Sequence, residues 1–83
     1  MNMQQDQEKL KNIRIQIDQI DQNLISLLDQ RLLLALSALA YKKQVLDKKR
    51  EQEILKKTPS KYLKAIFQEI LTSTKKEQKK PQN

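Results

Sequence analysis

The chain has 83 residues, with no glycine, cysteine or histidine, and its 17 basic and 10 acidic side chains give a net charge of +7. The length limits it to one domain, and the missing residue types exclude thiol and imidazole chemistry, disulfides, the usual zinc sites and glycine-rich phosphate loops. Because Leu, Ile, Lys, Gln and Glu dominate, we expect an all-α fold in a single domain, residues 1–83.

The longest predicted helix runs from about Glu8 to Lys43 or Gln44, after a disordered leader, residues 1–7. An apolar seam at alternating spacings of four and three follows this helix without a Gly or Pro. The seam positions are Ile13, Ile17, Ile20, Leu24, Leu27, Arg31, Leu34, Ala38 and Tyr41. At ~1.5 Å per residue the helix exceeds ~50 Å, more than a compact monomer of this size covers. We therefore expect an intertwined, obligate homodimer with an antiparallel partner helix.

Arg31 lies within this seam, and leucines at 32, 33, 34 and 36 surround it. We expect this part of the helix to be buried on all sides, where a charge is unfavourable unless an anionic group meets it. Asp29, Gln30 and Arg31 interrupt the apolar run, which argues against a membrane-spanning helix. The N-terminus lacks the apolar core of a signal peptide, so we expect a cytoplasmic protein.

Two shorter helices are predicted after the long one. Asp47 can cap a helix from about Lys48 to Lys57, and Pro59 ends it. Thr58 or Ser60 can cap the third helix, from about Lys61 to Lys79, with residues 80–83 disordered. The apolar stripe of the third helix comprises Leu63, Ile66, Phe67, Ile70 and Leu71.

Several polar residues fall on these apolar faces. Lys42 follows Arg31 by three helical turns, so both cations can point into one elongated pocket. The second helix contributes two more of these polar residues, Asp47 and Glu51, with Arg50 at the border of their face. The third helix contributes Thr74 and Gln78, which lie one turn apart. Cations, a carboxylate and neutral hydrogen-bonding groups suit a small anionic ligand with a hydroxyl or ether oxygen.

Arg14 lies ~25 Å before Arg31 along the helix axis, too far to share a small ligand within one chain. In an antiparallel dimer, the partner's Arg14 could lie beside Arg31 and complete the site. Two convergent arginines bind two carboxylates through charge-assisted bonds.

Each residue also has a structural interpretation. Arg31 could snorkel or pair with an Asp across the interface. Lys42 could be solvated, Asp47 could serve as an N-cap alone, and Glu51 could pair with a nearby lysine. Thr74 and Gln78 could mark the end of the core.

Taken together, these residues resemble the all-helical (type II) chorismate mutase family from Leu10 to Gln78. The family's first arginine, Ile/Asp pattern and second arginine are matched between Arg14 and Arg31, and its lysine is matched by Lys42. Its Asp-x-x-Arg-Glu motif is matched from Asp47 to Glu51. Its third-helix signature is matched by Ile66 and Phe67, then Thr74 and Gln78.

This resemblance implies a cofactor-free, metal-free rearrangement of chorismate to prephenate in aromatic amino-acid biosynthesis. Arg31 and the partner's Arg14 would hold the two carboxylates. Lys42 and Gln78 would donate to the ether oxygen, and Glu51 would accept from the ring hydroxyl. Asp47, Arg50 and Thr74 would support the ligand or its neighbours.

The chain departs from the family pattern in two ways. Thr74 stands where the family has Ser, which keeps the hydroxyl. The connections from Lys42 to Asp47 and from Arg50 to Phe67 are also shorter than in the family.

Three alternatives remain. An isochorismate–pyruvate lyase shares this fold and its two arginines and lysine, although Glu51 favours the mutase. A non-catalytic basic dimer could bind nucleic acid or acidic lipid. The three aromatic residues are not interleaved with the lysines, so there is no platform for base stacking. This alternative would also leave to chance the spacing of Arg14, Arg31, Lys42, Glu51 and Gln78, and we expect neither partner. A regulatory relative could bind the metabolite without turning it over.

Overall fold

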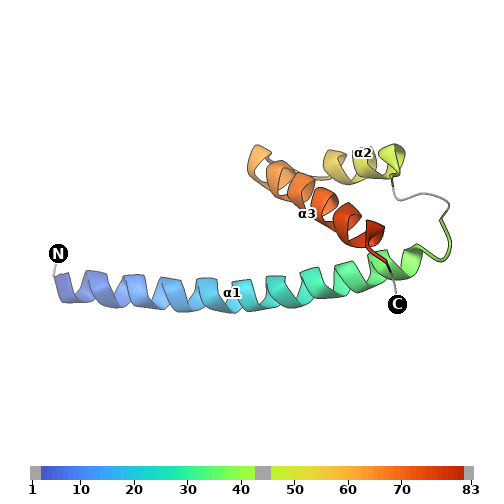
Figure 1. The fold of residues 1–83 in the computed structure, drawn as a ribbon. Coiled ribbons are helices and arrows are strands. Elements are labelled where there is room, and N and C mark those ends of the chain that lie inside the picture. Colours follow the sequence, from blue (N-terminus) through green and yellow to red (C-terminus); the bar gives the residue numbers. More distant parts are fainter. Residues whose placement is uncertain (1–2, 43–45, 82–83) are drawn as a thin grey trace. The chain divides into compact units, whose positions relative to one another are not determined.

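The computed structural model describes residues 3–42 and 46–81 and contains three helices over that range (Figure 1). These are α1 (Met3–Ala38), α2 (Lys48–Lys56) and α3 (Lys61–Lys79), with no strand in the described residues. The expected all-α class is therefore confirmed. The chain divides into two compact units, Met1–Arg31 and Leu32–Asn83.

The first unit is formed by α1 up to Arg31. This helix begins at Met3, so the leader predicted to be frayed is helical from that residue onward. The segment before Glu8 contains no Gly or Pro, and Asp6 in the first turn complements the positive end of the helix dipole. Every residue from Met3 to Gln30 is exposed, including Ile13 at 53% and Ile20 at 58%. The seam positions from Ile13 to Leu27 are therefore all exposed within the single chain.

Burial on all sides around Arg31 is not found within the chain. Arg31, Leu32 and Leu36 are half-buried, whereas Leu33 is 66% exposed and Leu34 is 71% exposed. An all-round apolar helix segment can be covered only by surrounding elements, and one chain does not supply them for these two leucines.

The second unit contains the last turns of α1 together with α2 and α3, and α2 packs against α3 (Figure 1). Its apolar contacts come from Leu71, which is buried, and from half-buried residues on the two short helices. These half-buried residues are Ile54, Leu55, Leu63, Phe67 and Ile70. The predicted apolar stripes of α2 and α3 therefore face each other, with Ile66 at the exposed edge.

Local capping interactions set the ends of the two short helices. Asp47 is the N-cap of α2, and Ser60, rather than Thr58, is the N-cap of α3, its hydroxyl accepting from the N–H of Leu63 at 3.1 Å. Thr58 instead closes α2, since its hydroxyl donates to the carbonyl of Leu55 at 2.6 Å. Pro59 follows and prevents the helix from continuing. The predicted bounds of α3 are confirmed, and α2 ends one residue early.

The end of α1 differs from the prediction. The helix stops at Ala38, and the predicted end at Lys43 or Gln44 lies outside the described residues. The N–H groups of Leu39, Ala40 and Tyr41 bond to carbonyls three residues earlier, which tightens the chain into a turn. Tyr41, the last predicted seam position, is 92% exposed, so no packing holds an additional helical turn in place.

Candidate active site

Gln78, on the last turns of α3, is the most buried of the predicted site residues, at 7% exposure. Its Nε2 donates to the backbone carbonyl of Ala35 at 2.8 Å. Ala35 provides one of the last four carbonyls of α1, which lack partners within the helix. Three of these four carbonyls accept from the turn after Ala38, and Gln78 supplies the donor for the fourth. Gln78 is therefore a side-chain cap for the end of α1.

Glu51, in the first turn of α2, forms an ion pair with Lys75 of α3. The ammonium nitrogen of Lys75 lies 3.1 Å from Oε2 and 3.3 Å from Oε1 of Glu51, and the two side chains are 27% and 23% exposed. Partial burial makes such a pair stronger than one in bulk water. The interpretation that Glu51 pairs with a nearby lysine is thus confirmed.

Asp47 and Arg50 occupy the start of α2. Oδ1 of Asp47 accepts from the N–H of Arg50 at 3.0 Å, as an N-cap does. The Arg50 guanidinium lies 3.9 Å from Glu53 on the exposed side of the same helix. This exposed pair contributes little to stability. Asp47 is therefore accounted for structurally, and Arg50 lies at the solvent edge of α2.

Thr74 is half-buried, one turn before Gln78 on α3. Its hydroxyl donates to the carbonyl of Ile70 at 2.6 Å, which directs that hydrogen along the helix. On this part of α3, residues at helical spacing are buried or half-buried: Leu71, Thr74, Lys75 and Gln78. On this face of α3, the apolar stripe ends at Leu71, and the next inward positions are polar.

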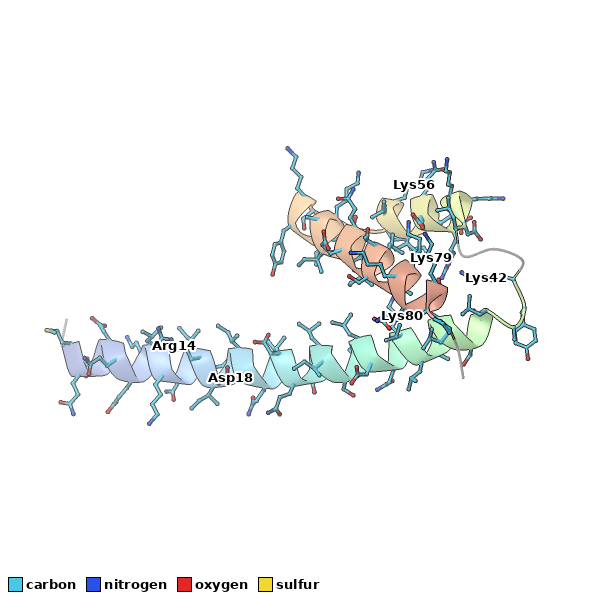
Figure 2. The ribbon with its side chains drawn as sticks, in the orientation of Figure 1. Arg14, Asp18, Lys42, Lys56, Lys79 and Lys80 are labelled. Atoms are coloured by element: carbon cyan, nitrogen blue, oxygen red, sulfur yellow. The ribbon has the colours of Figure 1, made fainter. Side chains whose placement is uncertain are left out.

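Lys42 lies beyond the end of α1, in the second unit (Figure 2). The prediction that Lys42 continues the helix three turns after Arg31 is wrong, because the chain leaves helical geometry after Ala38. Lys42 is nevertheless half-buried. Its position depends on the turn after α1 rather than on helical phase.

Arg14 and Arg31 belong to the first unit. Arg14 is exposed on α1, one turn before Asp18 (Figure 2), and Arg31 is half-buried at the last position of that unit. The second unit thus contains Lys42, Asp47, Arg50, Glu51, Thr74 and Gln78. Within it, packing of α2 on α3 places the Glu51 carboxylate against the helix that carries Thr74 and Gln78.

The chemistry of the second unit is that of hydrogen bonding and fixed charge. It offers an amide donor at Gln78, a carboxylate at Glu51 and ammonium groups at Lys42 and Lys75. In the part of the chain that the structure describes, no cluster of three or more acidic side chains is arranged to hold a metal ion. Nor does any helix there have the length and apolar character to span a membrane.

Lys75 is the site neighbour that the sequence interpretation missed. Its spacing from Leu71 and Gln78 places it on the inward face of α3, and this spacing was the available signal. A lysine among several lysines near a chain end resembles a solvated tail, so its pairing with Glu51 becomes visible only when α2 packs on α3.

The structure therefore defines an all-α chain in which polar side chains follow the inward faces of two packed helices. The family model described as chorismate mutase type II matches residues 13–79, most of the chain, and the protein belongs to that family. No curated protein and no solved structure matches the chain.

Proposed function

We propose that this protein is a chorismate mutase that converts chorismate to prephenate by a pericyclic rearrangement. The observation that carries the proposal is the family match over residues 13–79, which includes every proposed site residue. Glu51, Thr74 and Gln78 support it further, because they occupy the inward faces of the packed helices α2 and α3.

In the proposed roles, cationic and amide donors bind the oxygens of the substrate, and a carboxylate binds its hydroxyl. Arg31 and the partner's Arg14 bind the two carboxylates of chorismate, and Lys42 and Gln78 donate to its ether oxygen. Glu51 accepts from the ring hydroxyl. In supporting positions, Asp47 caps α2, Arg50 lies at its edge, and Thr74 provides a hydroxyl on α3.

A pericyclic rearrangement suits these residue types, since it needs no nucleophile and no proton transfer. The enzyme has to select the compact, chair-like conformer and to stabilise negative charge on the ether oxygen as the C–O bond breaks. Fixed donors from an ammonium and an amide provide that stabilisation. The reaction proposed here accordingly uses no cofactor.

The cap formed by Gln78 is compatible with its proposed role. A primary amide has two N–H donors, and one of them is donated to the carbonyl of Ala35. That bond fixes the amide in a buried position, and the second hydrogen is the one that we assign to the ether oxygen. A donor held in place before the reaction needs no reorganisation at the transition state.

We further propose that the protein acts as a single-domain homodimer. The seam residues of α1 are exposed along the first unit, with Leu24 at 49% and Leu27 at 59%, and a second copy would bury them. In this dimer we propose that Arg14 of one chain lies beside Arg31 of the other, as the family resemblance implies.

The proposal is tested by incubating the purified protein separately with chorismate and with isochorismate and identifying the products. Prephenate formed from chorismate is the expected result. Pyruvate released from isochorismate, with chorismate unchanged, would identify the protein as a lyase of the same family instead.

Lys42 provides a sharper test of the proposed roles. Lys42→Ala should abolish prephenate formation while leaving helicity unchanged, because this half-buried cation lies outside the helices. Lys57→Ala, an exposed lysine just after α2, is the matched control. Retention of most activity in Lys42→Ala would refute the assignment of Lys42 to the ether oxygen.

A further inference from the structure

Lys75 has an unusual location for a lysine in a strongly basic chain. It lies on the same face of α3 as buried Leu71 and Gln78, whereas its neighbour Lys76 is exposed. Immobilising a long, flexible side chain and partly removing its charge from water are both unfavourable unless a partner compensates. The compensating partner is Glu51.

The geometry of this pair constrains Glu51 in particular. Both carboxylate oxygens of Glu51 lie within hydrogen-bonding distance of one ammonium nitrogen, at 3.1 and 3.3 Å. A glutamate side chain otherwise samples several rotamers about its three torsions. The ammonium of Lys75 therefore restricts the carboxylate, and the positive end of the helix dipole at the start of α2 attracts it as well.

We propose that Lys75 is a positioning residue of the active site, which holds the Glu51 carboxylate in the orientation that accepts the ring hydroxyl of the substrate. This inference rests on the proposed function and adds a residue to it. An ionised carboxylate has acceptor sites for more than one donor. Glu51 can therefore keep its bond to Lys75 and receive a hydroxyl as well.

A purely structural role for the pair would have different consequences. α2 has nine residues, and its half-buried apolar side chains within the helix are Ile54 and Leu55, so the ion pair could simply attach it to α3. In that case Lys75→Met would lower the stability, because it leaves the Glu51 carboxylate partly buried and unpaired, but the protein that folds would keep its kcat/KM for chorismate.

The experiment compares kcat/KM for chorismate among the unaltered protein and four variants, with helicity measured for each. The variants are Lys75→Met, Lys75→Arg, Glu51→Gln and the double variant Glu51→Gln/Lys75→Met. Lys76→Met, which removes the same charge from the adjacent exposed position, is the matched control. We expect Lys75→Met to lower kcat/KM by about 10- to 100-fold, the scale of a misplaced active-site group. In Lys75→Arg, kcat/KM should stay within about threefold of the unaltered protein, because an arginine restores the ion pair. In Lys76→Met, kcat/KM should stay in the same range, because this side chain is exposed.

The double variant tests whether Lys75 acts through Glu51, whereas the kcat/KM of folded Lys75→Met separates positioning from stability. If Lys75 acts through Glu51, the double variant is no slower than Glu51→Gln alone, since the carboxylate to be positioned is already gone. Separate losses that multiply in the double variant would overturn the inference, as would full activity in Lys75→Met. If Lys75→Met does not fold, Lys75→Ala takes its place in the comparison, because it removes the same charge but leaves room for water to hydrate the Glu51 carboxylate. Absence of turnover in the unaltered protein would overturn the proposed function as well.

Discussion

The amide of Gln78 has two roles in this account, one in capping α1 and one in the proposed reaction. One of its hydrogens is donated to the Ala35 carbonyl at the end of α1, and the other is the one proposed for the ether oxygen. The end of α1 and the orientation of the amide therefore depend on each other.

Gln78→Ala should lower the free energy of unfolding by about 1–3 kcal/mol, because it leaves a helix-terminal carbonyl without its donor. Gln78→Glu should be at least as destabilising, since a carboxylate cannot donate and would lie at the negative end of the α1 dipole. Urea unfolding at a fixed chain concentration measures both effects, with Gln68→Ala on the exposed side of α3 as the control. Unchanged stability in Gln78→Ala would show that the cap is not formed.

Asp47→Ala should cost about 1 kcal/mol of stability through loss of the N-cap of α2, whereas Asp47→Asn should be nearly neutral. The same unfolding measurement tests this pair of variants. Equal destabilisation by both substitutions would mean that the charge of Asp47 matters more than its capping oxygen.

Whether a side-chain interaction could be predicted from the sequence depends on how far apart its two partners lie along the chain. The cap at Asp47 was predicted because its donor, the N–H of Arg50, lies three residues away. The bonds from Gln78 to Ala35 and from Lys75 to Glu51 join residues 43 and 24 positions apart. No local pattern encodes such pairs, and they depend on how the helices pack.

The bounds of whole helices were likewise predictable where local residues set them, and not where a distant residue did. The two short helices were predicted nearly to the residue because Asp47, Pro59 and Ser60 are local start and stop signals. The end of α1 was predicted several residues too late because the sequence from Ala38 to Lys42 contains no Gly or Pro. That end is set by the turn and by the Gln78 cap, which comes from another helix.

The apolar seam of α1 yields a prediction about assembly. Ile20→Lys should weaken the proposed dimer by roughly 100-fold or more, because each copy would bring an unpaired charge into the interface. Gln19→Lys, the same substitution on the polar side of the helix, should leave it intact. Sedimentation over a range of chain concentrations measures the change. A monomeric unaltered protein, or an unaltered association constant in Ile20→Lys, would contradict the proposed interface.

At the scale of the whole molecule, the proposed site requires two chains. In that proposed site, Arg31 and the partner's Arg14 together bind the two carboxylates of the substrate. The all-α class and family membership were predicted from the sequence and are confirmed. Assembly and the sharing of the site remain predictions, because the structure describes one chain.

Mixing two inactive variants tests the shared site directly. Arg14→Ala and Arg31→Ala should each lose activity, but after joint unfolding and refolding the mixture should recover about a quarter of the activity. In a random mixture, half of the dimers are mixed, and each mixed dimer has one site with both arginines intact. Recovery would not occur if both arginines of a site came from the same chain, and that outcome would refute the exchange.

The most direct test of the central claim is the disappearance of chorismate in the presence of the purified protein, with the product identified. The account predicts prephenate as the product, with its formation lost in Arg31→Ala and retained in Lys9→Ala, which removes an exposed charge from the same helix. If the folded, helical protein leaves chorismate unchanged, or if Arg31→Ala is as active as the unaltered protein, the assigned activity and its site are contradicted.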